Sequence, residues 1–225
     1  MSNKSGTLYI VSTPIGNLND ITNRAIEILN NVDLCAAEDT RKSIKLFNAY
    51  NINTKLTSFH KFSENSKTAA LIAELLKGKN IAIISDAGTP LISDPGRFLV
   101  NEAIREGIEV LPIPGVTSVI TALSVSGFNI DNFKYYGFFP RKKKERETLI
   151  QEVSSSGLTA VFFESGKRLR NLLNDISKKL PERVQVLVAR EMTKIHETYY
   201  RGTVLEVTKQ LDHSEYGTKG EFVLI

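Results

Sequence analysis

Residues 81–96, IAIISDAGTPLISDPG, join a short apolar run to a polar loop rich in glycine and proline. Four consecutive apolar residues are typical of a strand that helices bury on both faces. Asp86 would stand near the tip of this strand, and Gly88 would let the backbone approach a ligand closely. Because ligands bind at the carboxyl ends of strands in open parallel sheets, the loop is a candidate binding site. The alternative is a simple turn that Asp86 caps and Gly88 permits.

Apolar periodicity predicts alternating strands and helices along the chain. The expected strands lie first at 7–12, 34–37, 55–59, 81–85 and 109–113, and then, after a linker at 127–132, at 135–139, 159–163, 184–189, 198–204 and 221–225. Helices are expected in the intervals up to residue 179, at 21–31, 41–50, 66–77, 116–126, 144–154 and 167–179, and in the helix that Pro95 opens, for which Asp94 is the expected N-cap. We therefore expect an α/β protein of two α/β domains with a cleft between them. The N-terminal domain, 1–127, would hold a mostly parallel sheet, and the C-terminal domain, 128–225, a mixed sheet.

Composition excludes several classes of protein. The 225 residues are 41% hydrophobic and 24% charged, which rules out intrinsic disorder. No apolar run approaches the roughly 18 residues of a membrane helix, and the N-terminus carries no signal-peptide core. The single cysteine, Cys35, excludes an intramolecular disulfide, and three scattered histidines give no basis for a metal site. We expect a soluble, cytoplasmic protein without a membrane or metal partner.

Absent motifs narrow the field of enzymes further. No G-x-G-x-x-G follows a predicted strand, and no G-x-x-x-x-G-K-[ST], G-x-S-x-G or H-E-x-x-H occurs in the sequence. These are the motifs of dinucleotide-binding dehydrogenases, P-loop nucleotidases, serine hydrolases and zinc peptidases, respectively. All four classes are therefore poorly supported.

Charged residues follow two other predicted strands. Glu38-Asp39-Thr40-Arg41 ends the second strand, and residues 190–194, Arg-Glu-Met-Thr-Lys, follow a strand of the second domain. Charges after a buried strand are costly unless they are paired or face a cleft. The first group is thus either a cleft site or a helix cap with a local Asp39–Arg41 pair, and the second is either a cleft site or a surface turn. Thr117 and Ser118, after a Pro-Gly break, are either ligand groups or helix caps.

Charge points to a class of partner. The chain has 29 Lys and Arg against 25 Asp and Glu, a net charge of +4, and the excess is concentrated at Arg141-Lys142-Lys143-Lys144. Cations at a helix N-terminus oppose the helix dipole. A basic cluster placed there, close to the aromatic residues of 135–139, suggests a partner with phosphates. The alternative is an ordinary solvated helix start.

Eight stretches follow one another along the chain: TLYIVSTPIGNLND (7–20), AEDTR (37–41), SDAGTPLISDPG (85–96), IPGVTS (113–118), GFFPRK (137–142), FFESG (162–166), AREMTKIHE (189–197) and KGEFV (219–223). Together they resemble the ribosomal RNA small subunit methyltransferase I family, which belongs to the tetrapyrrole methylase superfamily. The resemblance covers nearly the whole chain, and several of the stretches are long and specific. Longer members of the family continue past the last strand, whereas this sequence ends at Ile225.

The resemblance implies a class III methyltransferase fold, with S-adenosylmethionine in a cleft between two α/β domains, and a homodimer. It also implies methylation of the ribose 2′-hydroxyl of cytidine-1402 in 16S ribosomal RNA of the small ribosomal subunit. By their position within the motifs, the residues expected to bind the cofactor are Pro14, Asp86, Ala87, Gly88, Thr89, Ile92, Thr117, Ser118, Phe163, Glu164 and Met192.

The implied reaction is an in-line attack of the ribose oxygen on the sulfonium methyl group, for which alignment in a dry cleft supplies much of the acceleration. Because a ribose hydroxyl is a poor nucleophile, a side chain that accepts its proton would help. The candidates for base or positioning work are Asp39, Arg41, Glu191 and Lys194, and those for the RNA backbone are Arg141, Lys142, Lys143 and Lys144. Two alternatives stay open: a precorrin-type tetrapyrrole C-methyltransferase, and a non-catalytic RNA-binding relative.

Overall fold

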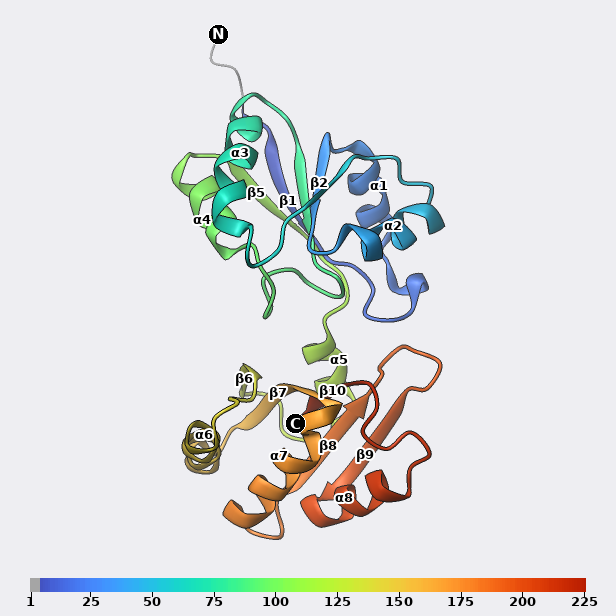
Figure 1. The fold of residues 1–225 in the computed structure, drawn as a ribbon, viewed down its shortest axis with the longest axis vertical. Coiled ribbons are helices and arrows are strands. Elements are labelled where there is room, and N and C mark those ends of the chain that lie inside the picture. The colour runs from blue at the N-terminus through green and yellow to red at the C-terminus, as the bar shows by residue number, and fades with distance from the viewer. Residues whose placement is uncertain (1–4) are drawn as a thin grey trace. The chain divides into compact units, whose positions relative to one another are not determined.

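The computed structural model describes residues 5–225, which divide into two compact units that meet in sequence between Thr117 and Ser118 (Figure 1). Each unit is a β-sheet with helices packed on it, so the predicted α/β class is confirmed. The boundary predicted from the sequence, after residue 127, lies ten residues further along the chain. The short helix α5 (Ser118–Ser124) groups with the second unit because it packs on β10 (Glu221–Leu224) and because Arg201 donates a hydrogen bond to the Val125 carbonyl at 2.8 Å.

The first unit contains a parallel sheet. Within residues 5–117 the strands follow the order β3-β2-β4-β1-β5, and every pairing is parallel. The strands are β1 (Thr7–Val11), β2 (Leu34–Ala37), β3 (Leu56–Ser58), β4 (Ile81–Ile84) and β5 (Glu109–Ile113). The helices are η1 (Leu18–Asp20), α1 (Asn23–Asn31), α2 (Thr40–Ala49), α3 (Glu64–Leu76) and α4 (Arg97–Arg105). Figure 1 shows α1 and α2 on one face of the sheet and α3 and α4 on the other.

The central strand β4 accounts for this layered arrangement. Successive side chains of a strand point to opposite faces. Ala82 and Ile84 therefore belong to the core beneath α1 and α2, whereas Ile81 and Ile83 belong to the core beneath α3 and α4. All four are buried, as the unbroken apolar run predicts. Full burial of an isoleucine side chain stabilises the fold by roughly 1.5–3 kcal/mol.

Helix α4 begins at Arg97, so the prediction that Asp94 caps it is wrong. The N-cap residue is Gly96, whose φ of 128° suits glycine and which has no side chain to offer. The cap comes from α3: the Glu64 Oε1 atom accepts hydrogen bonds from the Gly96 N–H at 3.0 Å and the Phe98 N–H at 2.9 Å. We call this contact the Glu64 clasp. A carboxylate at a helix N-terminus also interacts favourably with the helix dipole.

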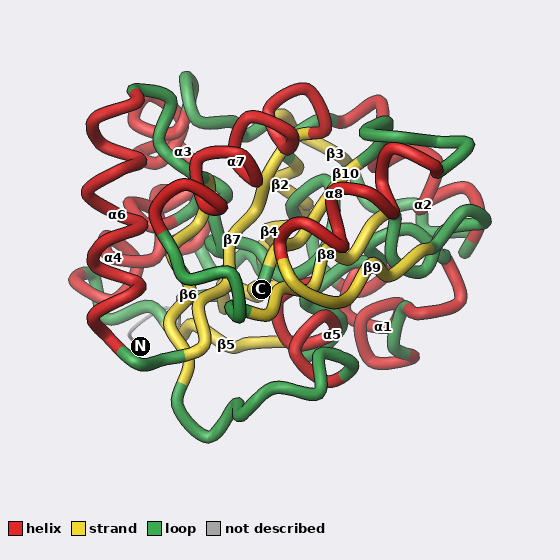
Figure 2. Tube along the Cα trace, turned by 90° about the horizontal axis from the view of Figure 1, so that it is seen from below, coloured by secondary structure: helices red, strands yellow, loops and turns green. Residues whose placement is uncertain are grey.

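The second unit contains a mixed sheet. Within residues 118–225 the strands, yellow in Figure 2, follow the order β6-β7-β10-β8-β9, in which β6 and β7 are parallel and the other neighbours antiparallel. The strands other than β10 are β6 (Phe133–Phe138), β7 (Thr159–Ser165), β8 (Gln185–Arg190) and β9 (Thr198–Thr203). Its longer helices are α6 (Lys143–Ser156), α7 (Gly166–Lys179) and α8 (Val204–His213), which share one apolar core with the sheet.

Helix α8 lies where the sequence predicts no helix: the strand expected at 198–204 ends at Thr203, and Val204 begins α8. The strand ends at Thr203 because that residue begins a capping box. The Thr203 hydroxyl accepts from the Glu206 N–H at 3.3 Å, and the Glu206 carboxylate accepts from the Thr203 N–H at 2.7 Å. The helix then buries Val204, Val207 and Leu211 in the core.

Replacing Glu64 with alanine should lower the free energy of unfolding by about 1–2 kcal/mol, because the start of α4 loses the acceptor for two N–H groups. Urea denaturation followed by circular dichroism measures the loss. Glu27→Ala, at an exposed position of α1, is the matched control and should change stability by less than about 0.5 kcal/mol. An equal effect of the two substitutions would contradict a stabilising role for the clasp.

Candidate functional site

The loops that follow β1 and β4 are joined at the carboxyl edge of the first sheet. Thr13 and Gly88 exchange two backbone hydrogen bonds, of 2.9 and 3.0 Å, and the hydroxyls of Ser12 and Thr89 lie 2.9 Å apart. Pro14 follows this bridge and is buried. The structure thus brings the first predicted strand tip against the Asp86–Thr89 loop, as parallel pairing requires.

The loop after β5 joins the same group. The Thr89 hydroxyl donates to the Val116 carbonyl at 3.1 Å, which places this loop next to Thr117. Gly115 lies so close to the first loop that an added Cβ would come within 2.7 Å of the Ser12 Cβ. The tips of β1, β4 and β5 therefore contact one another through hydroxyl groups and backbone, and a side chain at Gly115 would not fit between them.

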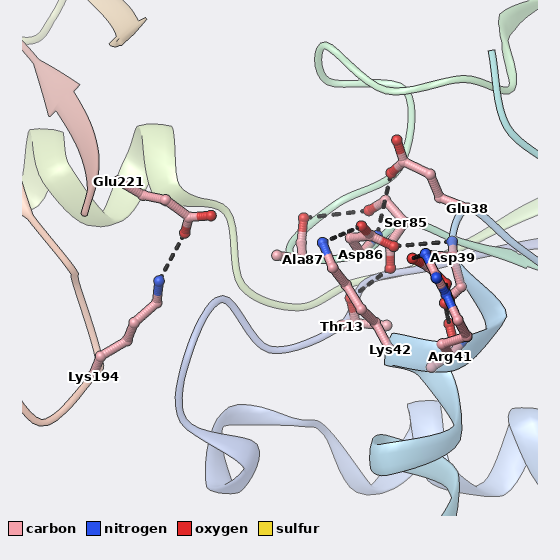
Figure 3. Close-up of polar contacts among 11 residues, drawn as sticks. Thr13, Glu38, Asp39, Arg41, Lys42, Ser85, Asp86, Ala87, Lys194 and Glu221 are labelled. Carbon is pink, nitrogen blue, oxygen red and sulfur yellow. Dashed lines mark hydrogen bonds and ion pairs between the residues drawn. The ribbon is translucent and has the colours of Figure 1, made fainter. Parts of the chain in front are cut away.

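Asp86 links this edge to the tip of β2 (Figure 3). Its carboxylate accepts from the Asp39 N–H at 3.0 Å and from Lys42 Nζ at 2.6 Å, while its own N–H donates to the Glu38 carboxylate at 3.4 Å. Lys42 was not among the predicted site residues. It directly follows Arg41 and lies three residues after Asp39, the N-cap of α2, and this spacing is the signal that could have identified it.

Asp39 and Arg41 form the local pair that the sequence offered as one alternative. The Asp39 carboxylate caps α2 by accepting from the Arg41 N–H at 2.9 Å, and it accepts from Arg41 Nε at 3.0 Å and Nη2 at 2.7 Å. The hydrogen bonds from Arg41 lower the pKa of Asp39 to about 2. A carboxylate with so low a pKa is a weak proton acceptor at neutral pH.

Asp94 lies close to two further carboxylates. Burial, reinforced by the negative charges of Glu38 and Asp86, raises the pKa of Asp94 to about 6, against a hydrogen bond with Ser85 that acts the other way. Burial and the charge of Asp86 also raise the pKa of Glu38. We call Glu38, Asp86 and Asp94 the carboxylate edge. Concentrated negative charge of this kind suits a cationic group of a ligand.

Several predicted residues of the second unit also meet at one sheet edge. The strand pairings set Phe138 beside Phe163, Glu164 beside Phe222, and Phe222 beside Arg190. The ends of β6, β7 and β8 and the start of β10 therefore coincide. Phe163, which is partly exposed, contacts the rings of Tyr135 and Phe138 edge to face, with centroids 5.1 and 5.5 Å away.

Glu164 is committed to a structural ion pair. Its side chain is almost wholly buried and accepts from Arg168 Nε at 2.7 Å and from the Ser165 N–H at 2.7 Å. Arg168 in turn donates to the Phe139 carbonyl at 2.9 Å. Removing one partner of a buried pair leaves an uncompensated charge, so this carboxylate has little freedom to serve a ligand.

Glu191 and Lys194 form a compact group with Glu221. Lys194 Nζ contacts Glu191 Oε1 at 3.0 Å and Glu221 Oε2 at 2.8 Å, the latter drawn in Figure 3. Although burial acts in the opposite direction, these two carboxylates raise the pKa of Lys194, and contacts with the Glu221 N–H and Lys194 lower the pKa of Glu191. Both side chains are thus charged at neutral pH. Met192, which lies between these two residues in the sequence, is buried.

The basic segment Arg141–Lys144 is exposed, and its backbone is held in place. Arg168 donates to the Phe139 carbonyl, and Arg146 Nη1 donates to the Arg141 carbonyl at 2.7 Å. Arg146 is itself neutralised by Asp175 at 2.7 Å. Lys142 and Lys143 contact Glu145 and Glu147 at 3.1 and 3.9 Å on the surface. The two arginines were not predicted, since only the folded chain shows which carbonyls they reach.

The remaining predicted cofactor residues occupy exposed or partly exposed positions. Ala87 is exposed at the loop tip, Ile92 is 40% exposed, and Ser118 is the first residue of α5. Within residues 5–225 no cluster of three or more His, Cys, Asp or Glu side chains is placed to hold a metal ion. No helix of the same residues has the length and apolar character needed to cross a membrane.

Comparison with solved structures identifies the fold. The chain superposes with a TM-score of 0.68 on a cobalt precorrin-4 methyltransferase of cobalamin biosynthesis, at 17% identity, covering 97% of this chain and 93% of that one. It superposes with a TM-score of 0.64 on the uroporphyrin-III C-methyltransferase of Thermus thermophilus, at 18% identity and the same coverage. At these identities the likeness concerns the fold alone.

Sequence comparison identifies the family. Residues 7–208 match the model of the Tetrapyrrole (Corrin/Porphyrin) Methylases. Proteins named ribosomal RNA small subunit methyltransferase I are similar over nearly the whole chain: that of Halalkalibacterium halodurans is 46% identical (98% of this chain, 75% of the relative), that of Escherichia coli O157:H7 47% (99% and 78%), and that of Borrelia garinii subsp. bavariensis 46% (97% and 97%). The chain therefore belongs to the tetrapyrrole methylases and, within them, to the ribosomal RNA small subunit methyltransferase I family.

Proposed function

We propose that this methyltransferase transfers a methyl group from S-adenosylmethionine to the ribose 2′-hydroxyl of a cytidine in small-subunit ribosomal RNA. The observation that carries the proposal is the 46–47% identity, over nearly the whole chain, to relatives named for methylation of that RNA. The carboxylate edge and the exposed basic segment supply the two kinds of surface that such a reaction needs. The proposed place of action is the cytoplasm, where ribosomal subunits are found.

The residues of the first unit fit the proposed cofactor. S-adenosylmethionine, when bound, supplies an electrophilic methyl group on a positively charged sulfur. Asp86 and Glu38 would hold its cationic groups, and the hydroxyls of Ser12 and Thr89 can bond to its polar atoms. Gly88 and its neighbours would offer bare backbone. The rest of the proposed cofactor set is Pro14, Ala87, Ile92 and Thr117 in this unit and Ser118, Phe163 and Met192 in the second, with Glu164 contributing through its backbone.

The best candidate for the proton acceptor is Asp94 rather than Asp39. A general base works best when its pKa lies near the operating pH, and the pKa of Asp94, about 6, meets this condition better than that of Asp39, about 2. Asp39 and Arg41 are then positioning groups for the tip of β2. Glu191 and Lys194, which neutralise each other, are proposed to position the edge of the second sheet.

A tetrapyrrole C-methyltransferase is the weaker alternative. Its substrates are rich in carboxylates, which the negative charge of Glu38, Asp86 and Asp94 would repel. The exposed cations at 141–144 also have no role in that reaction. A non-catalytic RNA-binding relative would not need the match between the carboxylate edge and a cationic methyl donor. The homodimer implied by the family resemblance stays a prediction, which sedimentation velocity tests.

Incubation with S-adenosylmethionine labelled in its methyl group should transfer label to small ribosomal subunits, with the label on a cytidine ribose after nuclease digestion. If no label is transferred to the subunits while a precorrin in a parallel reaction is methylated, the protein is a tetrapyrrole C-methyltransferase. If calorimetry detects no binding of S-adenosylmethionine, the protein is a non-catalytic RNA-binding relative.

Asp94→Asn should lower kcat by at least about 100-fold, because proton acceptance contributes on the order of 10²–10⁴ to such reactions. The wild-type rate should rise with pH and level off above the pKa of Asp94, near 6, and this rise should be lost in the variant. Asp39→Asn is the matched control: asparagine keeps the helix cap, so the pH profile should keep its shape. A normal pH profile in Asp94→Asn would exclude Asp94 as the base.

The same substitution should change stability in a pH-dependent way. The folded-state pKa of Asp94 is raised from 3.8 to about 6, so protonation favours the folded state below pH 4, and this contribution is lost as the pH rises through 6. Relative to the wild type, Asp94→Asn should therefore gain stability between pH 4 and pH 7. Urea denaturation at several pH values measures the difference; a difference independent of pH would contradict the raised pKa.

Substituting glutamine for both Arg141 and Lys144 should weaken binding to small ribosomal subunits. It should also reduce the slope of log affinity against log salt concentration by about 1–2. These two side chains should matter more than Lys142 and Lys143, which have carboxylate partners. Filter binding at several salt concentrations measures the slope. Lys178→Gln with Lys209→Gln, two exposed positions on α7 and α8, is the control. An unchanged slope in the Arg141 and Lys144 variant would remove the basic segment from the RNA interface.

A further inference from the structure

The turn that follows β3 holds a phenylalanine side chain in solvent. Phe62 is 96% exposed, although the turn around it is well bonded. The Ser63 N–H donates to the His60 carbonyl at 2.8 Å, and the Ser63 hydroxyl accepts from the His60 N–H at 3.1 Å. Phe59, which enters the turn, is buried and donates its N–H to the Ala37 carbonyl at 2.7 Å. The fold therefore presents Phe62 outward from a turn that is fixed on both sides.

The Glu64 clasp brings a second aromatic side chain to this region. Glu64 follows the turn directly, and its carboxylate bonds to the first residues of α4, where Phe98 is 43% exposed. Exposed cations adjoin both rings in sequence: Lys61 precedes Phe62, and Arg97 precedes Phe98. The Glu64 carboxylate, the acidic group nearest in sequence to Lys61 and Phe62, is occupied by two backbone N–H groups, and the acidic group nearest in sequence to Arg97 is Asp94 of the carboxylate edge. The region thus combines two exposed rings with two exposed positive charges.

This region adjoins the proposed reaction site. β3 pairs with β2, and Ala37, whose carbonyl anchors the turn, immediately precedes Glu38 of the carboxylate edge. The turn therefore leaves the sheet at the edge where β2 delivers Glu38 and Asp39. Side chains placed here would meet parts of a substrate that lie outside the reacting nucleotide.

We propose that Lys61, Phe62, Arg97 and Phe98 form an RNA-binding surface, on which an unpaired base of the substrate stacks against Phe62 while the two cations contact phosphates. The inference rests on the proposed function and adds a substrate contact to it. Alternation of exposed rings and cations is how proteins bind single-stranded RNA, because every base offers a π-face and every linkage a negative charge. A protein partner would call for a continuous apolar patch, whereas positive charges interrupt this surface.

The test measures kcat and KM for methylation of unmethylated small ribosomal subunits, together with their binding by filter assay. Phe62→Ala should weaken binding and raise KM by about 5- to 100-fold, with kcat unchanged, because stacking on a base is lost. Phe62→Trp should restore wild-type values, whereas Phe62→Leu should not, because leucine keeps the apolar bulk without the π-face. Ile104→Ala, which removes another exposed apolar side chain of the same unit, is the matched control and should behave as wild type.

The salt dependence of binding tests whether Lys61 and Arg97 contact phosphates. Lys61→Gln and Arg97→Gln should each reduce the slope of log affinity against log salt concentration by about 1. Phe62→Ala should leave the slope unchanged, since it removes no cation. Thermal melting should be the same for the exposed Phe62 variants and the wild type, which separates a substrate contact from a folding defect.

Wild-type binding by Phe62→Ala would overturn the inference, as would full rescue by Phe62→Leu. If the alanine variant binds subunits normally but changes the sedimentation coefficient, the surface contacts a second copy of the chain, and the inference is likewise overturned. Absence of methyl transfer by the wild type would instead refute the proposed function. The two failures are therefore distinct.

Discussion

The parallel pairing of β4 with both β1 and β2 is the constraint on which the rest of the first unit depends. It delivers the tips of three strands to one edge, where Asp86 bonds to the backbone of Asp39 and Thr13 bonds to Gly88. A shift of one residue in this register would turn the apolar side chains of β4 toward the opposite faces and separate those contacts. The carboxylate edge is thus a product of the sheet's hydrogen bonding rather than of any single loop.

The sequence predicted those parts of the fold that local signals determine. The apolar run at 81–84, the alternation of strands and helices in the first unit, and the polar tips of its strands appear in the structure where they were expected. The N-cap of α4 was misassigned because Asp-Pro is a strong local capping signal, whereas the actual cap, Glu64, lies on another helix. The α8 capping box was readable in Thr203 and Glu206, but the two tyrosines before it and the β-branched Thr203 and Val204 favoured a continued strand.

The candidate site was harder to predict than the fold, because charge and burial decide its chemistry. The sequence offered Asp39, Arg41, Glu191 and Lys194 as candidates for base or positioning work, and the structure pairs each of them with a neighbour of opposite charge. It assigned Asp94 to a structural role, yet burial beside two carboxylates makes this the group with the most perturbed acidity at the edge. No pattern of residue types shows which carboxylates lie side by side after folding.

The backbone between β6 and α6 has a consequence for how the protein can change. Arg168 and Arg146 hold the carbonyls of Phe139 and Arg141, and each arginine is neutralised by a carboxylate, Glu164 or Asp175. The path of this loop is therefore specified by side chains that stand behind it. Substitutions of the exposed side chains at 142–144 therefore leave the backbone of the loop unchanged. During evolution the affinity of this surface can change while its backbone conformation is conserved.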